Sequence, residues 1–270
     1  MGIGAITNLL WSVIVNRISQ CSYLFAVYLF LYAPILVLIA YSFNDSSYSL
    51  VWHEFTFKWY RSLLENTDLQ IVALHSLLVG VLAATGATAL GTLAAICLYR
   101  YKFFGKKILH ALIFILVVSP DIVIGISLLI LFSTLKITLG FWTLLLSHIT
   151  FCIPFVTVTV YSRLTGEDKN IFEAAKDLGA TETIILRRVL LPLLSPAILA
   201  GWLLSFTLSM DDVMISFFVS GPEFDILPLK IFSLVRVGVK PEVNALCSVM
   251  FGLTLAVVLL YQLTFWKKKR

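Results

Sequence analysis

Between two long apolar runs, this chain reads Glu173-Ala174-Ala175-Lys176-Asp177-Leu178-Gly179-Ala180 and then, after eight residues, Val189-Leu190-Leu191-Pro192. The first of these segments is polar, whereas the 270-residue chain as a whole is 60% hydrophobic and only 13% charged. A soluble domain carries about 25% charged residues, so this composition indicates an all-α protein embedded in lipid. The polar segment must therefore lie outside the bilayer.

Local signals predict a helical hairpin over about residues 163–192. The carboxylate of Glu173 falls in the opening turns of a helix, where it interacts well with the helix dipole. Gly179 can end that helix in the left-handed conformation, and Thr181 can cap a second helix that runs to Leu191, before a proline. From composition alone, the hairpin either joins two spans or docks on a partner.

A helix that crosses a bilayer needs roughly 20 mostly apolar residues. Six segments qualify, which predicts six transmembrane helices in one domain over 23–266. They lie at about residues 23–43, 71–98, 108–132, 141–161, 193–219 and 243–266.

The two ends of the chain frame this domain. Residues 1–22 form an N-terminal segment, and residues 267–270 form a basic tail. The first apolar run of about 20 residues exceeds the 7–15 of a signal-peptide core, so we expect an uncleaved span. Scattered cysteines without a C-x-x-C spacing, and histidines far apart in sequence, predict packed side chains and no metal site.

Lysine and arginine predict the orientation of the chain. With both termini in the cytoplasm, the inner segments hold 14 of these residues and the outer segments hold 6. The hairpin then faces the cytoplasm. The outer side carries an aromatic loop over 44–70 and a second loop over 221–242, which contains a short apolar run. The basic residues sit between and after apolar runs, which argues against a nucleic-acid partner.

Three carboxylates lie within the predicted spans. An ionisable group at mid-bilayer costs about 2.5–3.5 kcal/mol on insertion scales, so it is usually functional. Asp121 directly follows Pro120, which invites a kink or break in the third span. Asp211 and Asp212 lie in the later half of the fifth span.

The hairpin resembles the EAA loop of the inner-membrane permeases of binding-protein-dependent ABC importers, which have the type I, MetI-like fold. Val189 stands where isoleucine is commoner. The matching residues are Glu173, Ala174, Ala175, Gly179, Leu191 and Pro192. Further segments are similar to the polyamine-importing branch of that family, over about residues 22–265. They include Ser119-Pro120-Asp121-Ile122-Val123, Ser205 to Asp212, and Leu227-Pro228-Leu229-Lys230-Ile231.

The resemblance implies a function and a set of partners. The chain would form half of a translocation path for spermidine or putrescine in a bacterial inner membrane. Its hairpin would be the coupling helix, with Glu173, Ala174, Ala175, Asp177 and Gly179 at the contact. The implied partners are a second permease subunit, a cytoplasmic ATPase dimer that binds ATP and Mg, and a periplasmic polyamine-binding protein.

A path for polyamines should offer carboxylates and aromatic faces. If the fifth span is one continuous helix, Ser209, Asp212 and Ser216 fall on one stripe about 80° wide, and Asp211 lies about 100° away. The predicted path residues are Asp121, Asp211, Asp212, Ser209, Ser216, Phe206 and Tyr161. Helix capping by Asp121, pairing of Asp211 at an interface, and ordinary packing of the aromatic rings are the alternatives.

Several functional classes lack their motifs. There is no G-x-x-x-x-G-K-[ST], so ATP hydrolysis would come from a partner, and the chain itself is not expected to be an enzyme or to hold a cofactor. A self-powered transporter would need an internal ion site and often an internal repeat, and neither is apparent. A membrane enzyme would need a convergent catalytic cluster. A permease for another small solute, such as an amino acid or thiamine, remains an alternative.

Overall fold

The structure is a computed structural model that describes residues 3–46, 51–167, 170–237 and 241–266. These residues are all-α apart from one isolated β-bridge between Asn44 and Phe55. The chain divides into unit 1, residues 1–66 and 234–270, and unit 2, residues 67–233.

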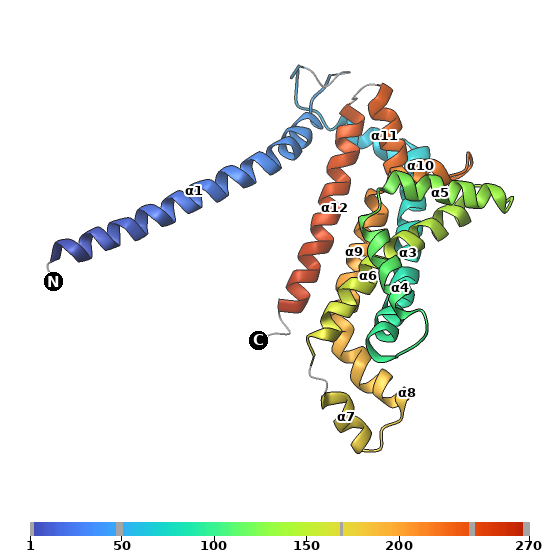
Figure 1. Cartoon of the computed structure of the whole chain (residues 1–270). Helices are drawn as coiled ribbons and strands as arrows, with labels where there is room; N and C mark the ends of the chain where they lie inside the picture. The colour runs from blue at the N-terminus through green and yellow to red at the C-terminus, as the bar shows by residue number, and fades with distance from the viewer. Residues whose placement is uncertain (1–2, 47–50, 168–169, 238–240, 267–270) are drawn as a thin grey trace. The chain divides into compact units, whose positions relative to one another are not determined.

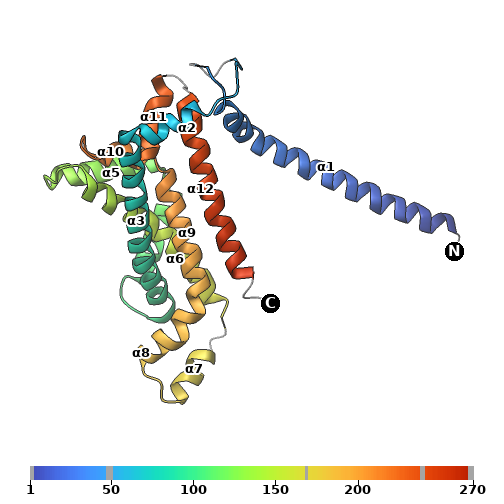
Figure 2. The ribbon, with the colours of Figure 1, turned by 180° about the vertical axis from the view of Figure 1, so that it is seen from behind.

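Unit 2 holds the packed helices. They are α3 (Thr67–Arg100), α4 (Lys106–Val118), α5 (Asp121–Thr134), α6 (Phe141–Thr165), α7 (Asn170–Asp177), α8 (Glu182–Ile184), α9 (Leu191–Asp211), α10 (Met214–Val219) and the greater part of α11 (Leu227–Val237). In Figures 1 and 2, α3, α6 and α9 run side by side, and α7 and α8 lie together at one end of these three helices.

Small residues bring the three long helices of unit 2 together. Val156 of α6 is fully buried, and Gly91 of α3 and Gly201 of α9 lie against it. A Cβ atom on Gly91 would stand 2.7 Å from the Cβ of Val156, and one on Gly201 would stand 3.2 Å from a methyl carbon of the same side chain. Glycines permit such close approach, which is how helices in lipid gain packing energy.

The predicted third span is broken. It forms α4 and α5, which meet at Ser119 and Pro120 with a bend of 115°. This break confirms that proline interrupts the helix, because Pro120 lacks an N–H and adopts the extended conformation at the start of α5. The α5 helix then packs on α10, with Gly125 against Ile215 and Phe218.

The predicted fifth span is broken as well. The sequence predicts one helix over 193–219, but α9 ends at Asp211 and α10 begins at Met214, with Asp212 in an extended conformation. The prediction of a continuous helix was therefore wrong. Its apolar run gave no sign of the break, because the break depends on side-chain contacts from α6 that are described below.

The predicted outer loop over 221–242 contains the helix α11. Ser76 of α3 accepts a hydrogen bond from the backbone N–H of Leu227 at 2.6 Å, and Ile226 and Leu227 are buried. A Cβ on Gly221 would stand 2.1 Å from the carbonyl oxygen of Leu139, so only glycine fits where the chain leaves α10. Contacts with distant parts of unit 2 thus fix the start of this helix.

Unit 1 consists of α1 (Ile3–Tyr41), α2 (Lys58–Glu65) and α12 (Pro241–Trp266). The α1 helix begins at Ile3, well before the predicted boundary at residue 23. Between α1 and α2, Asn44 accepts a hydrogen bond from the backbone of His53, and its own carbonyl accepts one from the indole of Trp59. The predicted aromatic loop is therefore folded, with the ring of Phe43 in contact with Phe55, Phe57 and Tyr60.

Four helices of the described chain are long and apolar enough to cross a membrane, and the bent pair of α4 and α5 makes a fifth. The apolar part of α12 that the structure describes in full, Pro241–Ala256, is shorter than this limit. The architecture is compatible with six spans. None of the residues in the apolar stretch of α1, Gln20–Tyr41, is buried.

Candidate functional site

The predicted hairpin forms at the end of unit 2 (Figure 1). Its first arm is α7, with Glu173 in the first turn. Gly179 has a φ of +77°, its N–H bonds the carbonyl of Lys176 at 2.8 Å, and the N–H of Ala180 bonds the carbonyl of Ala175 at 3.0 Å. These two bonds and the left-handed glycine make a Schellman motif, which confirms the predicted end of the helix.

The second arm differs from its prediction. Thr181 precedes α8 in the extended conformation of a cap residue, but its side chain makes no cap hydrogen bond. The helix was predicted to end before Pro192, but it does not end there. It passes through a π-helical turn, Ile185–Leu190, and continues into α9. The wider turn changes the hydrogen-bond register just before the proline, which has no N–H to donate, so the chain stays helical.

One face of the hairpin is exposed. Leu178 is 89% exposed at the turn. The exposed predicted contact residues are Glu173, Ala174, Asp177 and Gly179. Ala175 and Ala180 instead pack against the core of unit 2. Leu178, the one leucine in this polar segment, was not among the predicted contact residues.

An ionic cluster joins the hairpin to the end of α3. The guanidinium of Arg100, the last residue of α3, pairs with the carboxylate of Glu182 at the start of α8. The other carboxylate oxygen of Glu182 lies 3.4 Å from the ammonium of Lys176 on α7. Sequence reasoning missed this cluster, because residues so far apart in the chain give no local sign of contact.

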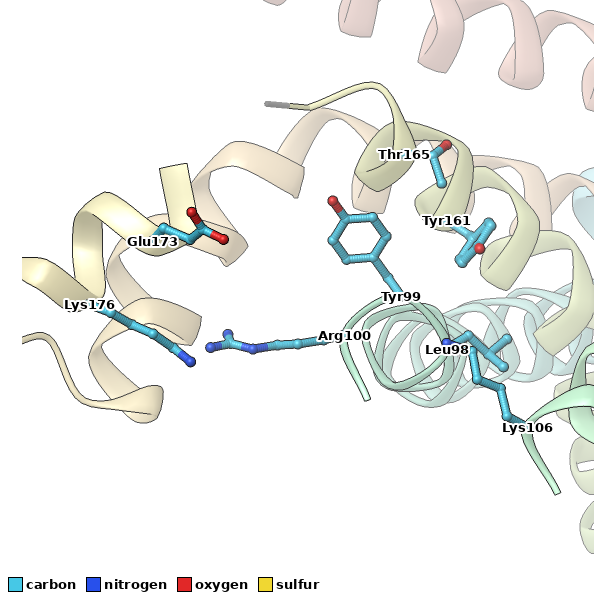
Figure 3. A pocket seen from close by; sticks show the side chains of 8 residues that line it. All are labelled: Leu98, Tyr99, Arg100, Lys106, Tyr161, Thr165, Glu173 and Lys176. Atoms are coloured by element: carbon cyan, nitrogen blue, oxygen red, sulfur yellow. The ribbon is translucent and has the colours of Figure 1, made fainter. Parts of the chain in front are cut away.

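A cleft of about 560 Å³ opens beside this cluster (Figure 3). Arg100 extends from the end of α3 toward Lys176, and Tyr161 contributes its ring from α6. The ring of Tyr161 also contacts the rings of Tyr99 and His110. The predicted path residue Tyr161 therefore lies at the hairpin end of unit 2.

A buried polar cluster holds the break between α9 and α10. Asp212 accepts hydrogen bonds from the backbone N–H groups of Ile215 and Ser216, at 3.1 and 2.8 Å, and from the hydroxyl of Ser216 at 2.6 Å. His148 of α6 lies 2.6 Å from the hydroxyl of Ser209 and 2.9 Å from that of Ser216. Asp212 thus serves as the side-chain cap of α10, and the cluster ties α6, α9 and α10 together.

This geometry corrects the premise of a polar stripe. The stripe required one continuous helix, but Ser209, Asp212 and Ser216 meet around His148 at a break and are all buried. The role of these three residues in a substrate path stays a prediction. His148 itself is packed and hydrogen-bonded, as expected, and the described residues contain no group of three or more His, Cys, Asp or Glu side chains placed to hold a metal ion.

The other predicted path residues have different surroundings. Asp211, the last residue of α9, and Asp121, the first residue of α5, are exposed. Phe206 stacks on Trp202 with the ring planes 2° apart and the centroids 5.5 Å apart. The structure therefore separates two accessible carboxylates from one buried, fully bonded carboxylate.

Membrane-length helices around a glycine-packed core, with a polar hairpin at one end, define a polytopic all-α membrane protein. Comparison with known proteins narrows this class. A model of the family described as "binding-protein-dependent transport system inner membrane component" matches residues 87–267. The chain belongs to this family, which has the MetI-like permease fold.

Curated relatives cover nearly the whole chain. The chain is 55% identical over 249 residues to the spermidine/putrescine transport system permease protein PotC of Escherichia coli (strain K12), covering 92% of this chain and 94% of that protein. It is 44% identical over 231 residues to the putrescine transport system permease protein PotI of the same organism, covering 83% and 82% of the two chains.

Solved structures share the fold at low sequence identity. A chain of a bacterial ABC transporter involved in the import of the acidic polysaccharide alginate is 15% identical, with a TM-score of 0.69, and the match covers 94% of this chain and 96% of that one. A chain of the MetNI methionine ABC transporter is 17% identical, with a TM-score of 0.55, covering 75% and 94%. These likenesses confirm the predicted fold.

Proposed function

We propose that this chain is one of two permease subunits of an ATP-driven polyamine importer in the bacterial inner membrane. The observation that carries this proposal is the 55% identity, over 92% of the chain, to a permease protein of a spermidine/putrescine transport system. The 44% identity to a putrescine permease protein supports the same substrate class. A second related permease would supply the other half of the path, and a periplasmic binding protein would deliver the substrate.

The hairpin is the proposed docking site for a cytoplasmic ATPase dimer. Its exposed face combines the carboxylates of Glu173 and Asp177 with the apolar side chain of Leu178. A protein interface has an apolar core and a polar rim, and Leu178 with its flanking carboxylates would supply both. ATP and Mg would bind to the partner, so the permease would move its helices and perform no chemistry.

The proposed path uses the accessible carboxylates of Asp121 and Asp211. Exposed carboxylates attract a multiply charged cation through long-range electrostatics, and a few weak sites allow it to leave again. The rings of Phe206 and Tyr161 would add cation–π contacts. Asp212, Ser209 and Ser216 would line the path only if the break between α9 and α10 opens during transport.

The proposed orientation places both termini and the hairpin in the cytoplasm. The excess of lysine and arginine in the inner segments supports this orientation. The bilayer would surround the long helices, whose outward side chains are apolar.

Reconstitution tests the substrate class. The chain would be assembled in liposomes with its second permease, ATPase and binding protein, and the uptake of labelled spermidine would be measured with unlabelled competitors present. We expect spermidine and putrescine to compete, and amino acids and thiamine to leave uptake unchanged. Uptake of one of those other solutes, with no polyamine uptake, would overturn the polyamine assignment.

A further inference from the structure

The three packed helices of unit 2 reach the hairpin in different ways. α6 precedes the hairpin in the chain, and α9 follows it through the π-helical turn, so both are linked to it covalently. α3 is not adjacent to the hairpin in the sequence. At its end Arg100 pairs with Glu182 of the hairpin, and Ile96 of α3 belongs to the same buried apolar cluster as Ile185 and Leu190.

The positions of Arg100 and Glu182 allow their ion pair to couple movement of the hairpin to movement of α3. The Arg100 side chain is only 16% exposed, and it ends the 34-residue helix α3. A cation is favourable at a helix C-terminus and an anion is favourable at an N-terminus, so Arg100 and Glu182 each sit at the helix end that stabilises them. Lys176 contacts the same carboxylate from α7, so Glu182 connects both arms of the hairpin to α3.

The α3 helix extends the link to the opposite end of unit 2. Ser76 lies 24 residues before Arg100, which corresponds to about 36 Å along a helix. At that end the hydroxyl of Ser76 binds the first N–H of α11, and the ring of His75 stacks on Phe224 at 4.0 Å. A displacement applied at Arg100 would therefore reach the chain that enters α11.

We propose that Arg100 and Glu182 are positioning residues that transmit movement of the coupling hairpin to α3. This inference rests on the proposed function, because it requires an ATPase that moves the hairpin. Glu182 lies beside the docking face, and its role is to hold α3 to the hairpin. Loss of the pair would leave the ATPase attached, and α3 would then follow the movement only through its packing on α6 and α9.

The test distinguishes a loss of ATPase binding from a loss of movement transfer between the hairpin and α3. Arg100→Gln and Glu182→Gln would be made in the complete complex, and three quantities would be measured: ATPase retained on purification, ATP hydrolysed, and substrate imported per ATP hydrolysed. We expect normal retention, hydrolysis within about twofold of wild type, and a fall of about tenfold in substrate imported per ATP, within the range of measured coupling energies. The exchanged pair, Arg100→Glu with Glu182→Arg, should recover part of the loss.

A matched control uses another arginine–glutamate pair. Arg163 and Glu167 pair at 2.6 Å with a spacing of four residues, so their contact is local to the end of α6. Arg163→Gln should leave the ratio of import to hydrolysis unchanged.

Two results would overturn the inference alone, namely loss of ATPase from the Arg100→Gln or Glu182→Gln complexes, or an unchanged import ratio in both. A wild-type complex without ATP-dependent uptake would overturn the proposed function, and the inference with it.

Discussion

Asp211 and Asp212 are neighbours in the chain with opposite environments. Asp211 is exposed at the end of α9, whereas Asp212 is buried, and its two carboxylate oxygens accept three hydrogen bonds. Burying a charge is costly unless it is paired and bonded, so Asp212 has a structural task that Asp211 does not share. The pair therefore allows a structural role and a transport role to be tested separately.

Asp212→Ala should lower the free energy of unfolding by about 2 kcal/mol, because it removes a helix cap and leaves buried donors without their acceptor. Thermal unfolding of the purified chain in detergent measures this loss. Asp211→Asn is the control, since it should keep the unfolding midpoint and lower the initial rate of polyamine uptake. Equal midpoints for Asp212→Ala and wild type would refute the capping role.

Gly179 is a second residue whose identity matters, because its backbone conformation favours glycine. Its φ of +77° is strained for any residue with a Cβ, and nothing lies within 4 Å of the place where that atom would be. Gly179→Ala should therefore destabilise the turn by about 1 kcal/mol through the backbone alone. We expect severalfold less ATPase to be retained by the purified complex.

Gly105 provides the matched control for this substitution. It has a φ of +88°, also with no neighbour within 4 Å, but it lies between α3 and α4. Gly105→Ala should cause similar backbone strain without loss of the ATPase. Equal losses in the two variants would mean that strain at any loop, and not the shape of the hairpin, weakens the complex.

Among the helices, close packing of α3 on α6 depends on Gly91. A Cβ at this position would also stand 3.0 Å from the backbone carbonyl oxygen of Ile153, which cannot move independently of its helix. Gly91→Ala should therefore cost about 2 kcal/mol, as overpacking usually does, despite the better helix propensity of alanine. Thermal unfolding in detergent is the measurement.

Gly252 in α12 serves as the control for Gly91. Nothing lies within 4 Å of its Cβ position, so Gly252→Ala should not lower the unfolding midpoint. If both alanine variants unfold at the wild-type temperature, the tight crossing of α3 and α6 is not a source of stability.

The helices that sequence predicted well are those marked by local signals. Apolar length predicts the long spans, Pro120 predicts the bend between α4 and α5, and Gly179 predicts the end of α7. These signals act within a few residues, so they can be read from one chain without knowledge of its packing.

The structural features that could not be predicted from the sequence depend on contacts between residues far apart in the chain. The break at Asp212 is stabilised by His148 of α6, whose ring forms hydrogen bonds with Ser209 of α9 and Ser216 of α10. Likewise, the start of α11 is fixed by Ser76, and the hairpin is held by Arg100. Tertiary contacts of this kind leave no periodic pattern, so an apolar run alone cannot reveal them. The first arm and the glycine turn of the hairpin were predictable, whereas its link to α3 was not.

For the molecule as a whole, the distribution of lysine and arginine predicts which side each loop occupies. Leu178→Cys offers a direct probe, because residue 178 is 89% exposed at the tip of the hairpin. With the four native cysteines replaced by serine, a membrane-impermeant maleimide should label this variant in inside-out vesicles and not in intact cells. Added ATPase should protect it from labelling.

Lys58→Cys is the opposite-side control for this labelling. Lys58 begins α2, and its side chain is 64% exposed in a predicted outer segment. The Lys58→Cys variant should be labelled when the maleimide can reach the outer side of the membrane. It should stay unlabelled when the maleimide reaches only the cytoplasmic side. Labelling of both variants from one side would contradict the proposed orientation.

In the proposed function, this chain imports polyamine only when a partner hydrolyses ATP. The most direct measurement is the initial rate of labelled spermidine uptake by liposomes that contain the complete complex, with and without ATP on the side of the ATPase. We expect uptake that depends on ATP and falls to background without it. Equal uptake in the absence of ATP, or uptake by this chain reconstituted without its ATPase, would identify a self-powered transporter and rule out an ATP-driven one.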